Sequence, residues 1–485
     1  MTKIHSATIV GIDAHPLIVS GTSMTEGKLR LIGLRNDVAE REASVRVRAA
    51  FNEALPGFEC VKGVVEVSSP VAGGYKPRGG ATDLAIAVAL LDMHEACDVP
   101  ADTFVVGELA LDGDVREVRG LLSHLALAAR TGMKRAIVPA ASAHELAPFI
   151  DQPHGFGTLE VFLAPSLEAV LRHFRGSQEM MSAWAARPRV VTTENHDMAD
   201  VRGLAEPKRA LEIAAAGNHS LLLIGPPGAG KTMLARRLTG LLPELGPEDH
   251  FLVARIQSAA GMSKGAPTRP FRAPHHTVSA AGLVGGGDPV RPGEVTLAHG
   301  GVLFLDEAPS FHPQAITALS RALREGVVNG MPSRPLVVAA MNPCPCGYHG
   351  WLPMGTAPRC ECSPARIASY RARIAPWLDL FDLQVNVGPV GRAALQRPAA
   401  AAPDSDSSEV IRHRVAESIG RRKHGAALLN DEASEQLLAT PFADALSPAS
   451  LVSVTRVART IAHLAGAETV RQEHMAEALA LAVRS

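Results

Sequence analysis

The residues with the clearest chemical meaning form the octapeptide GPPGAGKT at positions 225–232, a complete G-x-x-x-x-G-K-[ST] phosphate-binding loop. The apolar run LLLI at 221–224 predicts a buried strand before it, and residues 233–238 have helical spacing. Three glycines let the backbone curl until its N–H groups face one point, where a helix N-terminus adds partial positive charge. The residues expected to hold the phosphates are Gly225, Pro226, Pro227, Gly228, Ala229, Gly230, Lys231 and Thr232.

Two side chains of this loop and two later carboxylates have complementary roles. Lys231 would reach the β- and γ-phosphates of a nucleotide, and the Thr232 hydroxyl would ligate Mg²⁺. The apolar run GGVLFL at 300–305 predicts a buried strand that ends at Asp306 and Glu307. In a phosphate-loop NTPase the first acid holds Mg²⁺ and the second polarises the attacking water.

A third apolar run, at 335–341, predicts a strand that ends at Asn342, whose amide could orient the water near the γ-phosphate. The catalytic set predicted from these motifs is Lys231, Asp306, Glu307 and Asn342. The predicted Mg²⁺ ligands are Thr232 and Asp306.

Four of the six cysteines lie close together in the sequence, as two C-x-C pairs: Cys344, Cys346, Cys360 and Cys362. In a chain with no secretory signal such a cluster favours metal binding over disulfides. Four thiolates could hold Zn²⁺ tetrahedrally, although C-x-C spacing strains a single tetrahedral site more than C-x-x-C does. The sequence leaves zinc binding and reduced thiols in a surface loop as equal alternatives.

Composition limits the remaining possibilities. The 485 residues allow two to four domains, and 46% hydrophobic residues are enough for sizeable cores. The formal net charge is −1, so any contact with nucleic acid must come from a local surface. Apolar runs are short, and no signal-peptide pattern opens the chain. We therefore expect a cytoplasmic protein without a membrane partner.

The order of predicted elements indicates a multidomain α/β protein. In the first 175 residues we expect strands over 8–12, 29–32, 61–67 and 135–139, and helices over 38–54 and 82–93. The predicted units are an N-terminal domain at 1–175, a linker at 176–200, a nucleotide-binding core at 201–395, a flexible linker at 396–408 and a mostly helical unit at 409–485.

These residues resemble a known family. The chain is similar to YifB/ComM-type proteins, the magnesium-chelatase-related branch of the AAA+ ATPases. The strings that carry the resemblance are IVGIDAHP at 9–16, KRALEIAAAG at 208–217, RPFRAPHH at 269–276, GGG at 285–287, PGE at 292–294, MNPCPCG at 341–347 and VARTIA at 457–462.

The resemblance implies a Lon-protease-like α+β N-terminal domain, an AAA+ P-loop α/β core and an all-α C-terminal lid. It also implies ATP and Mg²⁺ as ligands, self-assembly into a hexameric ring, and action on branched or single-stranded DNA, as in recombination. The N-terminal domain would bind a further partner that the sequence does not identify.

The N-terminal domain departs from the Lon-type pattern at both residues of the protease dyad. Ala81 occupies the position of the nucleophilic Ser, and the position of the activating Lys falls at about Leu122. Thr82 lies one residue from the nucleophile position. Without a hydroxyl–amine dyad we expect a structural or partner-binding module that has no peptidase activity.

The core and lid depart from the family at two arginines. Leu380 stands where the family has an arginine that reaches the neighbouring subunit's site, and Ala449 stands where a second phosphate-sensing arginine belongs. An arginine finger is worth roughly 10³–10⁵ in rate where it has been measured. Arg366, Arg371 or Arg373 could replace the first of these arginines. Arg456 and Arg459 lie about two and three helical turns after the second position and need not reach the nucleotide.

Candidate DNA contacts are few. Residues 325–335 are expected to join a helix directly to a strand, because this segment is several residues too short for the family's pore hairpin. Arg334 is its only basic residue. The basic stretch at 412–424 could contact nucleic acid or form a solvated helix face. The resemblance assigns Arg272 and the adjacent pair His275 and His276 to a subunit interface or pore, and adjacent histidines rarely share one metal.

Four functions fit the sequence. The first is an ATP-hydrolysing ring motor that acts on DNA, and the second is a degenerate relative that binds ATP as a nucleotide-gated scaffold. A magnesium chelatase subunit is third, because that enzyme's ATPase subunit lacks the Lon-like domain. An ATP-dependent protease is fourth, because the dyad is absent.

Overall fold

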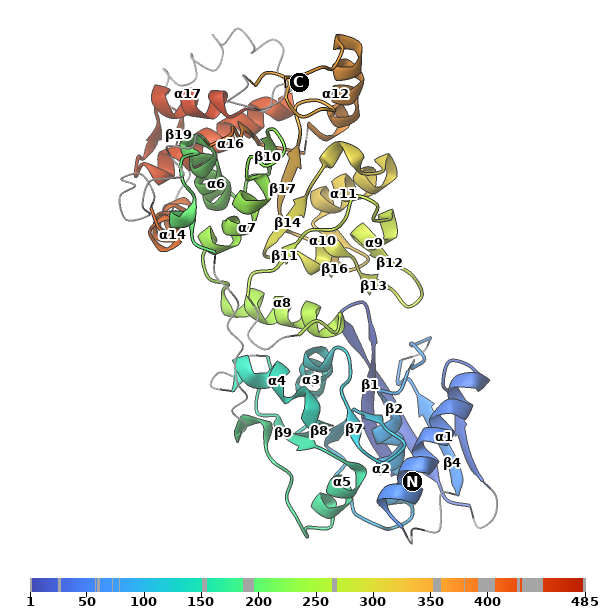
Figure 1. Ribbon diagram of the computed structural model, residues 1–485. Helices are drawn as coiled ribbons and strands as arrows, with labels where there is room; N and C mark the ends of the chain where they lie inside the picture. The colour runs from blue at the N-terminus through green and yellow to red at the C-terminus, as the bar shows by residue number, and fades with distance from the viewer. Residues whose placement is uncertain are drawn as a thin grey trace.

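The protein is described by a computed structural model, and no helix in the described part is both long and apolar enough to cross a membrane. The described residues are 2–24, 28–56, 58, 62–71, 73–77, 79–150, 155–185, 196–263, 268–351, 359–378, 380–390, 406–424, 428–429 and 448–482. Cys60, the flexible linker predicted at 396–408 up to residue 405, and residues 446–447 before Ala449 lie outside them. Figure 1 shows two sheets in separate lobes with one helix between them.

The N-terminal lobe is built on a mixed seven-stranded sheet with the order β3-β4-β2-β1-β5-β8-β9. The strands are β1 (Thr2–Val10), β2 (Asp13–Thr22), β3 (Leu29–Ile32), β4 (Gly63–Ser68), β5 (Thr103–Val105), β8 (Arg135–Pro139) and β9 (Glu160–Ala164). Strand β1 ends two residues earlier than the expected strand over 8–12, because Gly11 takes a φ of +64° and turns the chain into antiparallel β2. That prediction was wrong beyond Val10.

Helices cover both faces of this sheet. Helices α1 (Asp37–Ala54), α2 (Asp83–Met93) and α5 (Leu167–Phe174) share one apolar cluster with β1, β2 and β4. Helix α3 (Leu121–Arg130) and the short α4 (Ala143–Leu146) pack on the opposite face. Residues 84–91 of α2 are fully buried, which explains why this helix is apolar on all sides.

The second lobe contains an all-parallel five-stranded sheet with the order β11-β14-β17-β10-β18. Its strands are β10 (Leu221–Ile224), β11 (Phe271–Arg272), β14 (Val302–Leu305), β17 (Leu336–Met341) and β18 (Leu383–Asn386). Alternate residues of each strand face opposite sides, so both faces need helices to cover them. The helices of this lobe are α6 (Ala205–Gly217), α7 (Lys231–Leu241), α8 (Pro247–Ala259), α9 (Ala280–Val284), α10 (Glu294–Leu297), α11 (Pro313–Glu325) and α12 (Pro364–Leu378).

The C-terminal segment packs on the α6–α7 face of this sheet (Figure 1). It contains α14 (Ser408–His424), α16 (Pro448–Leu464) and α17 (Gln472–Ala480). One departure from the expected all-helical unit is a two-residue parallel ladder between β19 (Leu428–Leu429) and β20 (Thr469–Val470). The predicted 176–200 linker is partly packed, since Met180 and Ala183 are buried on the N-terminal lobe and Met198 on the second.

Short elements complete the described chain. The remaining strands are β6 (Glu108–Leu109), β7 (Val115–Arg116), β12 (Gly285–Gly286), β13 (Arg291–Pro292), β15 (Val327–Val328) and β16 (Met331–Pro332). The 3₁₀ helices are Ala140–Ser142, Ala147–Phe149, Ala183–Ala185, Met198–Asp200 and Ala308–Ser310.

Residues 325–335 form a hairpin, so the expected direct connection from helix to strand was wrong. Strands β15 and β16 pair antiparallel across Asn329 and Gly330, which take φ values of 50° and 77°. Asn-Gly favours the left-handed backbone of a two-residue hairpin turn, so the signal was present in the sequence. Met331, which pairs with Val328 next to the turn, is buried in one apolar cluster with Ile12 of the N-terminal lobe.

Helix α8 joins the two lobes by packing against α3 (Figure 1). Gly120 N donates to Ser258 O at 2.9 Å. Arg255 donates to Ser123 Oγ at 3.1 Å and to Asp13 Oδ1 at 2.7 Å. This contact between the lobes combines backbone, charged and apolar interactions.

We expect Leu122→Ala to destabilise the N-terminal lobe by about 2–5 kcal/mol, because removing a buried leucine side chain leaves a cavity. Leu122 is 1% exposed on α3 beside α8. The matched control is Leu111→Ala at a position 58% exposed, which should change stability by less than about 0.5 kcal/mol. Chemical denaturation followed by circular dichroism measures the free energy of unfolding of both variants. Equal losses of stability would contradict the burial of Leu122 in the core of the lobe.

Candidate nucleotide-binding site

The predicted phosphate-binding loop is the turn between β10 and α7. Gly228 and Gly230 take left-handed φ values of +75° and +94°, which only glycine adopts without strain. Helix α7 begins at Lys231, so its first N–H groups face the concave side of the loop. Strand β10 and the helix expected after the loop are both confirmed.

Lys231 lies inside this turn. Its Nζ donates to the carbonyl oxygens of Gly225 at 2.7 Å and Pro226 at 3.0 Å, and to Asn342 Oδ1 at 3.1 Å. Burial lowers the pKa of Lys231, and the nearby carboxylates of Asp306 and Glu307 partly offset that effect. One ammonium therefore connects the phosphate-binding loop to the residue that follows β17.

Asp306 follows β14 and faces the start of α7. The Thr232 hydroxyl donates to Asp306 Oδ2 at 3.0 Å, and the backbone N–H of Glu307 donates to Asp306 Oδ1 at 3.0 Å. A hydroxyl and a carboxylate oxygen in contact at the mouth of a phosphate-binding loop are the hard oxygen donors that Mg²⁺ prefers. These two residues fit the predicted Mg²⁺ ligands.

Glu307 has an unusual backbone and a histidine neighbour. Its φ is +52°, a left-handed conformation that non-glycine residues adopt at a cost and that is common at functional sites. His276 Nδ1 lies 3.7 Å from Glu307 Oε2, whereas His275 Nδ1 is bonded to Thr277 Oγ1 at 2.8 Å. No pattern along the chain predicts that His276 meets this carboxylate, because the two residues are 31 positions apart.

Together these residues line a pocket of about 570 Å³ at the carboxyl edge of the parallel sheet. Asn342, which follows β17, and Tyr370, which lies on α12, both line this pocket. The backbone of Asn342 forms a hydrogen bond with the Tyr370 hydroxyl. Burial raises the pKa of Tyr370 to about 12, so the phenol stays neutral at physiological pH. The pocket is the size of a small-molecule site and carries a cation, two carboxylates and neutral donors.

Known sequence families match this chain in three segments. Residues 197–395, which hold the whole pocket, match the family described as Magnesium chelatase, subunit ChlI. Residues 20–142 match Subunit ChlI of Mg-chelatase, and residues 425–482 match Magnesium chelatase, subunit ChlI C-terminal.

Full-length relatives decide the family. YifB of Escherichia coli is 34% identical over 99% of this chain and 96% of its own length. Competence protein ComM of Haemophilus influenzae is 33% identical over 98% of this chain and 96% of its own length. The chain belongs to the YifB/ComM family of magnesium-chelatase-related proteins. The resemblance seen in the sequence is therefore confirmed.

Similarity to Lon proteases is partial. Peroxisomal Lon protease homolog 2 of Arabidopsis thaliana is 32% identical over 164 residues, which are 32% of this chain and 18% of that protein. In this YifB/ComM-family chain, Ala81 and Leu122 pack in one apolar cluster. The Thr82 hydroxyl is buried without a hydrogen-bond partner among the described residues.

A buried ion pair lies beside these positions, and the sequence analysis missed it. Asp83 at the start of α2 accepts hydrogen bonds from Arg46 of α1, the shorter at 2.7 Å. Burial raises the pKa of Asp83 to about 6 although Arg46 acts in the opposite direction. The pair joins α1 to α2 at the turn where the Lon-type pattern has its nucleophile.

The two positions without arginine differ in their surroundings. Leu380 packs on the apolar cluster of α11 and β17, and its carbonyl accepts from Ser220 Oγ at 2.6 Å. Position 449 lies in the first turn of α16. The exposed arginines of α12 are Arg366, Arg371 and Arg373.

Asp382 forms a junction between the sheet and the C-terminal helices. It accepts from Ser453 Oγ at 2.5 Å and pairs with Arg456 at 3.2 Å, so Arg456 is engaged away from the pocket. His219 Nδ1 lies 3.3 Å from Asp382, and its Nε2 lies 2.8 Å from Thr460 Oγ1. Burial raises the pKa of Asp382, but the hydrogen bonds from His219 and Ser453 outweigh it and the pKa is lowered overall.

Most candidate DNA contacts are engaged within the chain. Arg414 of α14 pairs with Glu212 at 2.6 Å, and Arg421 donates to His463 O at 2.8 Å. Arg272, assigned by resemblance to an interface or pore, forms a two-point ion pair with Glu294 at 2.7 and 2.8 Å. Arg334 is exposed at the end of the β15–β16 hairpin.

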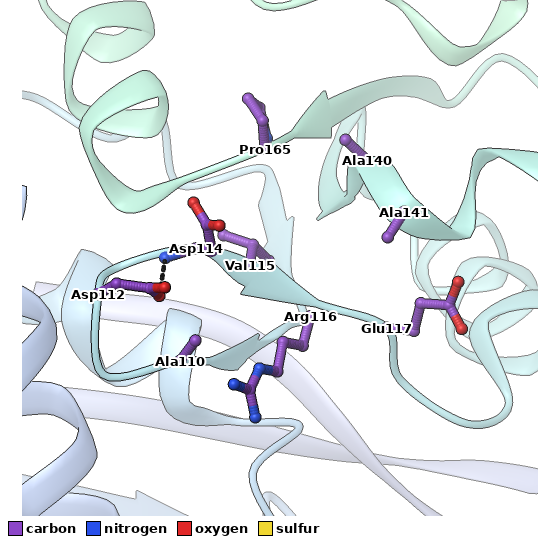
Figure 2. Close-up of a pocket in the computed structure, with 9 residues that line it drawn as sticks. All are labelled: Ala110, Asp112, Asp114, Val115, Arg116, Glu117, Ala140, Ala141 and Pro165. Atoms are coloured by element: carbon purple, nitrogen blue, oxygen red, sulfur yellow. Dashed lines mark hydrogen bonds between the residues drawn. The ribbon is translucent and has the colours of Figure 1, made fainter.

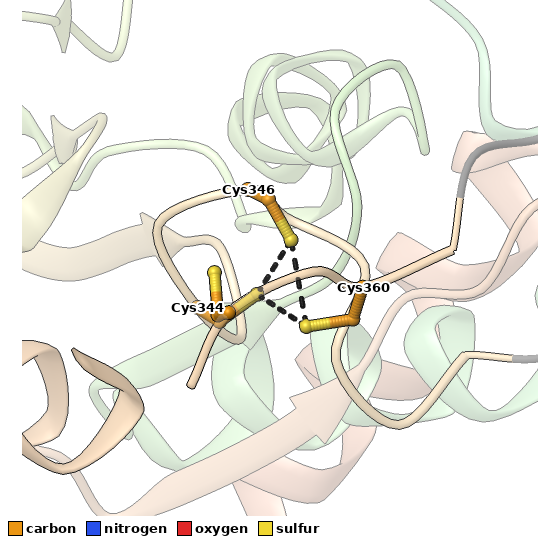
Figure 3. Close-up of side chains that lie close together, drawn as sticks. Cys344, Cys346 and Cys360 are labelled. Atoms are coloured by element: carbon orange, nitrogen blue, oxygen red, sulfur yellow. Dashed lines mark hydrogen bonds between the residues drawn. The ribbon is translucent and has the colours of Figure 1, made fainter. Parts of the chain in front are cut away.

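The four clustered cysteines meet in space. Their Sγ atoms all lie within 4.8 Å of one another, and Figure 3 shows Cys344, Cys346 and Cys360 pointing to a common centre. The strain expected for two C-x-C pairs does not prevent this arrangement. The fifth cysteine that the structure describes, Cys97, lies in the N-terminal lobe.

A second hollow lies on the N-terminal lobe, beside the β6–β7 hairpin. It measures about 560 Å³, and Figure 2 shows the carboxylates of Asp112, Asp114 and Glu117 around it, together with Arg116. The dashed bond runs from Asp114 N to Asp112 Oδ1 at 3.2 Å. None of the residues predicted to act on a nucleotide lines this hollow.

We expect Thr460→Val to destabilise the docking of the C-terminal helices by about 1–3 kcal/mol, because it leaves buried His219 Nε2 without its partner. Thr455→Val is the matched control on the same helix. Both hydroxyls also donate to the carbonyl four residues earlier, and only Thr460 meets His219. Thermal unfolding and limited proteolysis measure the difference, and equal shifts in both variants would refute a role for this junction.

Proposed function

We propose that the protein binds ATP with Mg²⁺ and hydrolyses it as a ring-forming motor that acts on DNA. The observation that carries the proposal is the meeting of three adjacent parallel strands at one edge. Strands β10, β17 and β14 end respectively at the phosphate-binding loop, at Asn342 and at Asp306 with Glu307. A Lys, a Thr–Asp pair, a second acid and an amide are the groups that phosphoryl transfer to water requires.

Each side chain has a role in this proposal. Lys231 would exchange its carbonyl partners for phosphate oxygens, while the backbone N–H groups of residues 228–232 hold the phosphates. Thr232 and Asp306 would hold Mg²⁺, which neutralises charge that develops on the phosphates. Glu307 would accept a proton from the attacking water, and Asn342 would orient that water.

The same family membership supports a three-unit organisation. We propose a Lon-like unit at 1–175, an AAA+ core at 201–395 and a helical lid at 409–485. The lid packs on α6 and α7, so its position is linked to the helix that begins at Lys231. In a hexameric ring, the exposed arginines of α12 would face a neighbouring subunit and replace the one absent at Leu380.

Support for DNA as the partner comes from the relative named competence protein ComM, because competence is the uptake of DNA. The second candidate function is a nucleotide-gated scaffold that binds ATP and hydrolyses it slowly or not at all. Leu380 favours it, because its side chain packs on an apolar cluster where the family has an arginine. A chelatase subunit and an ATP-dependent protease remain less favoured for the reasons given by the sequence.

Steady-state ATP turnover of the purified protein, measured with and without branched and single-stranded DNA, tests the proposal. We expect DNA to raise turnover and Glu307→Gln to lower it by about 10²–10⁴-fold, because the variant loses the general base.

Lys231→Ala should abolish ATP binding, whereas the surface controls Glu42→Gln and Lys28→Ala should behave as the wild type. Turnover no greater than that of Glu307→Gln, with tight ATP binding, would favour the scaffold, and turnover indifferent to DNA would exclude the DNA motor. Tight ATP binding by Lys231→Ala would refute the site.

We also expect His276→Ala to lower kcat by up to about fivefold without changing the Kd for ATP, because an exposed contact between a histidine and a carboxylate contributes at most about 1 kcal/mol. His276 contacts Glu307, and His275 does not. His275→Ala is therefore the matched control, and the contrast isolates the carboxylate contact from general damage to the loop. Equal kcat values for the two variants would remove His276 from the mechanism.

A further inference from the structure

The distances within the cysteine cluster fit one tetrahedral metal site. Cys344 Sγ lies 3.3 Å from Cys346 Sγ and 3.7 Å from Cys360 Sγ, and Cys346 Sγ lies 3.5 Å from Cys360 Sγ. Four thiolates at a Zn–S distance of about 2.3 Å lie about 3.8 Å apart, by tetrahedral geometry. A disulfide needs about 2.05 Å between sulfurs, so none of these three pairs is one.

The backbone around the cluster also fits a metal-thiolate site. His349 N donates to Cys344 Sγ at 3.3 Å, and the backbone of Tyr348 hydrogen-bonds Cys346. Such N–H donors stabilise thiolates bound to a metal and orient them. Cys344 is fully buried, and the other three are half-buried.

The loop that carries the first cysteine pair is in contact with the phosphate-binding loop. Gly347 has a φ of +89°, and a Cβ there would lie 2.5 Å from Pro227 Cδ. Pro345, between the two cysteines, lines the nucleotide pocket.

Cys344 is two residues after Asn342, which accepts a hydrogen bond from Lys231 Nζ. Trp351 at the far end of the loop packs against Gly388, just after β18.

We propose that Cys344, Cys346, Cys360 and Cys362 bind one Zn²⁺, and that the metal holds residues 343–351 against the phosphate-binding loop and so sets its affinity for nucleotide. The metal would tie together two segments that line the pocket. Cys344 and Cys346 flank Pro345, and Cys360 and Cys362 lead into α12, which carries Tyr370. The second half of this proposal rests on the proposed ATP binding. The first half does not.

Metal content of the purified full-length protein tests the first half. We expect about one zinc per chain, lost in the double variant Cys360→Ser/Cys362→Ser and kept in Cys97→Ser and in Lys231→Ala. Co²⁺ exchanged into the wild type should give the visible absorption of tetrahedral thiolate ligation, which does not depend on how the variants fold. Three results would each overturn the zinc site. They are protein without zinc in which all four thiols of the cluster can be alkylated, a disulfide within the cluster, and zinc retained by the double variant.

A pair of glycine variants tests the second half. Gly347 and Gly350 have similar left-handed φ values of +89° and +81°, but a Cβ at Gly350 meets nothing within 4 Å. We expect Gly347→Ala to weaken binding of a fluorescent ATP analogue by about tenfold, roughly 1.4 kcal/mol, and Gly350→Ala to leave it unchanged. Zinc-stripped wild type should show the same loss as Gly347→Ala, and zinc should restore it.

Two outcomes separate this proposal from the proposed function. If the wild type with zinc bound has no measurable affinity for the ATP analogue, the nucleotide proposal fails and the metal site stands. If the wild type binds the analogue and neither Gly347→Ala nor zinc removal changes the Kd, the link between metal and nucleotide fails. Equal losses in Gly347→Ala and Gly350→Ala would overturn the link as well, because backbone strain alone would explain them.

Discussion

The turn between β10 and α7 is the constraint on which the second lobe depends. Its backbone N–H groups must face inward, and two of its glycines adopt left-handed conformations to allow this. The turn is held by its own lysine and by contacts from neighbouring segments. Lys231 bonds two of its carbonyls, Gly225 N donates to Met341 O, and Gly347 contacts Pro227. The segment that follows β17 therefore braces the turn from two sides.

That dependence links the nucleotide pocket to parts of the chain that do not touch it. The cysteine cluster lies on the segment that carries Asn342, and the Asp382 junction lies just before β18, the other neighbour of β10. Both features therefore lie on segments that are continuous with the strands on either side of β10.

The N-terminal lobe has a different relation to the pocket. Helix α3, where the Lon-type pattern has its lysine, packs against α8, and Met331 of the β15–β16 hairpin packs against Ile12. The face that carries the dyad in a protease is thus used for contact between lobes. A lysine at Leu122 would have to be buried, at a high cost in desolvation. This gives a physical reason for the leucine that the sequence has there.

The sequence by itself determined which local structures form around the chemistry. The glycine spacing at 225–232, the apolar runs that end at Asp306 and Asn342, and the long helices all depend on periodicity and short-range sterics, which are readable along the chain. The Asn-Gly pair at 329–330 also indicated a hairpin turn, but the segment was judged too short to form a hairpin. Only the tertiary structure decided the order β14-β17-β10, and hence that the three motifs meet. It alone brought His276 to Glu307, His219 to Asp382 and Thr460, and the two C-x-C pairs to one centre. These contacts join residues up to 241 positions apart, and they depend on packing between elements, for which one sequence carries no periodic signal.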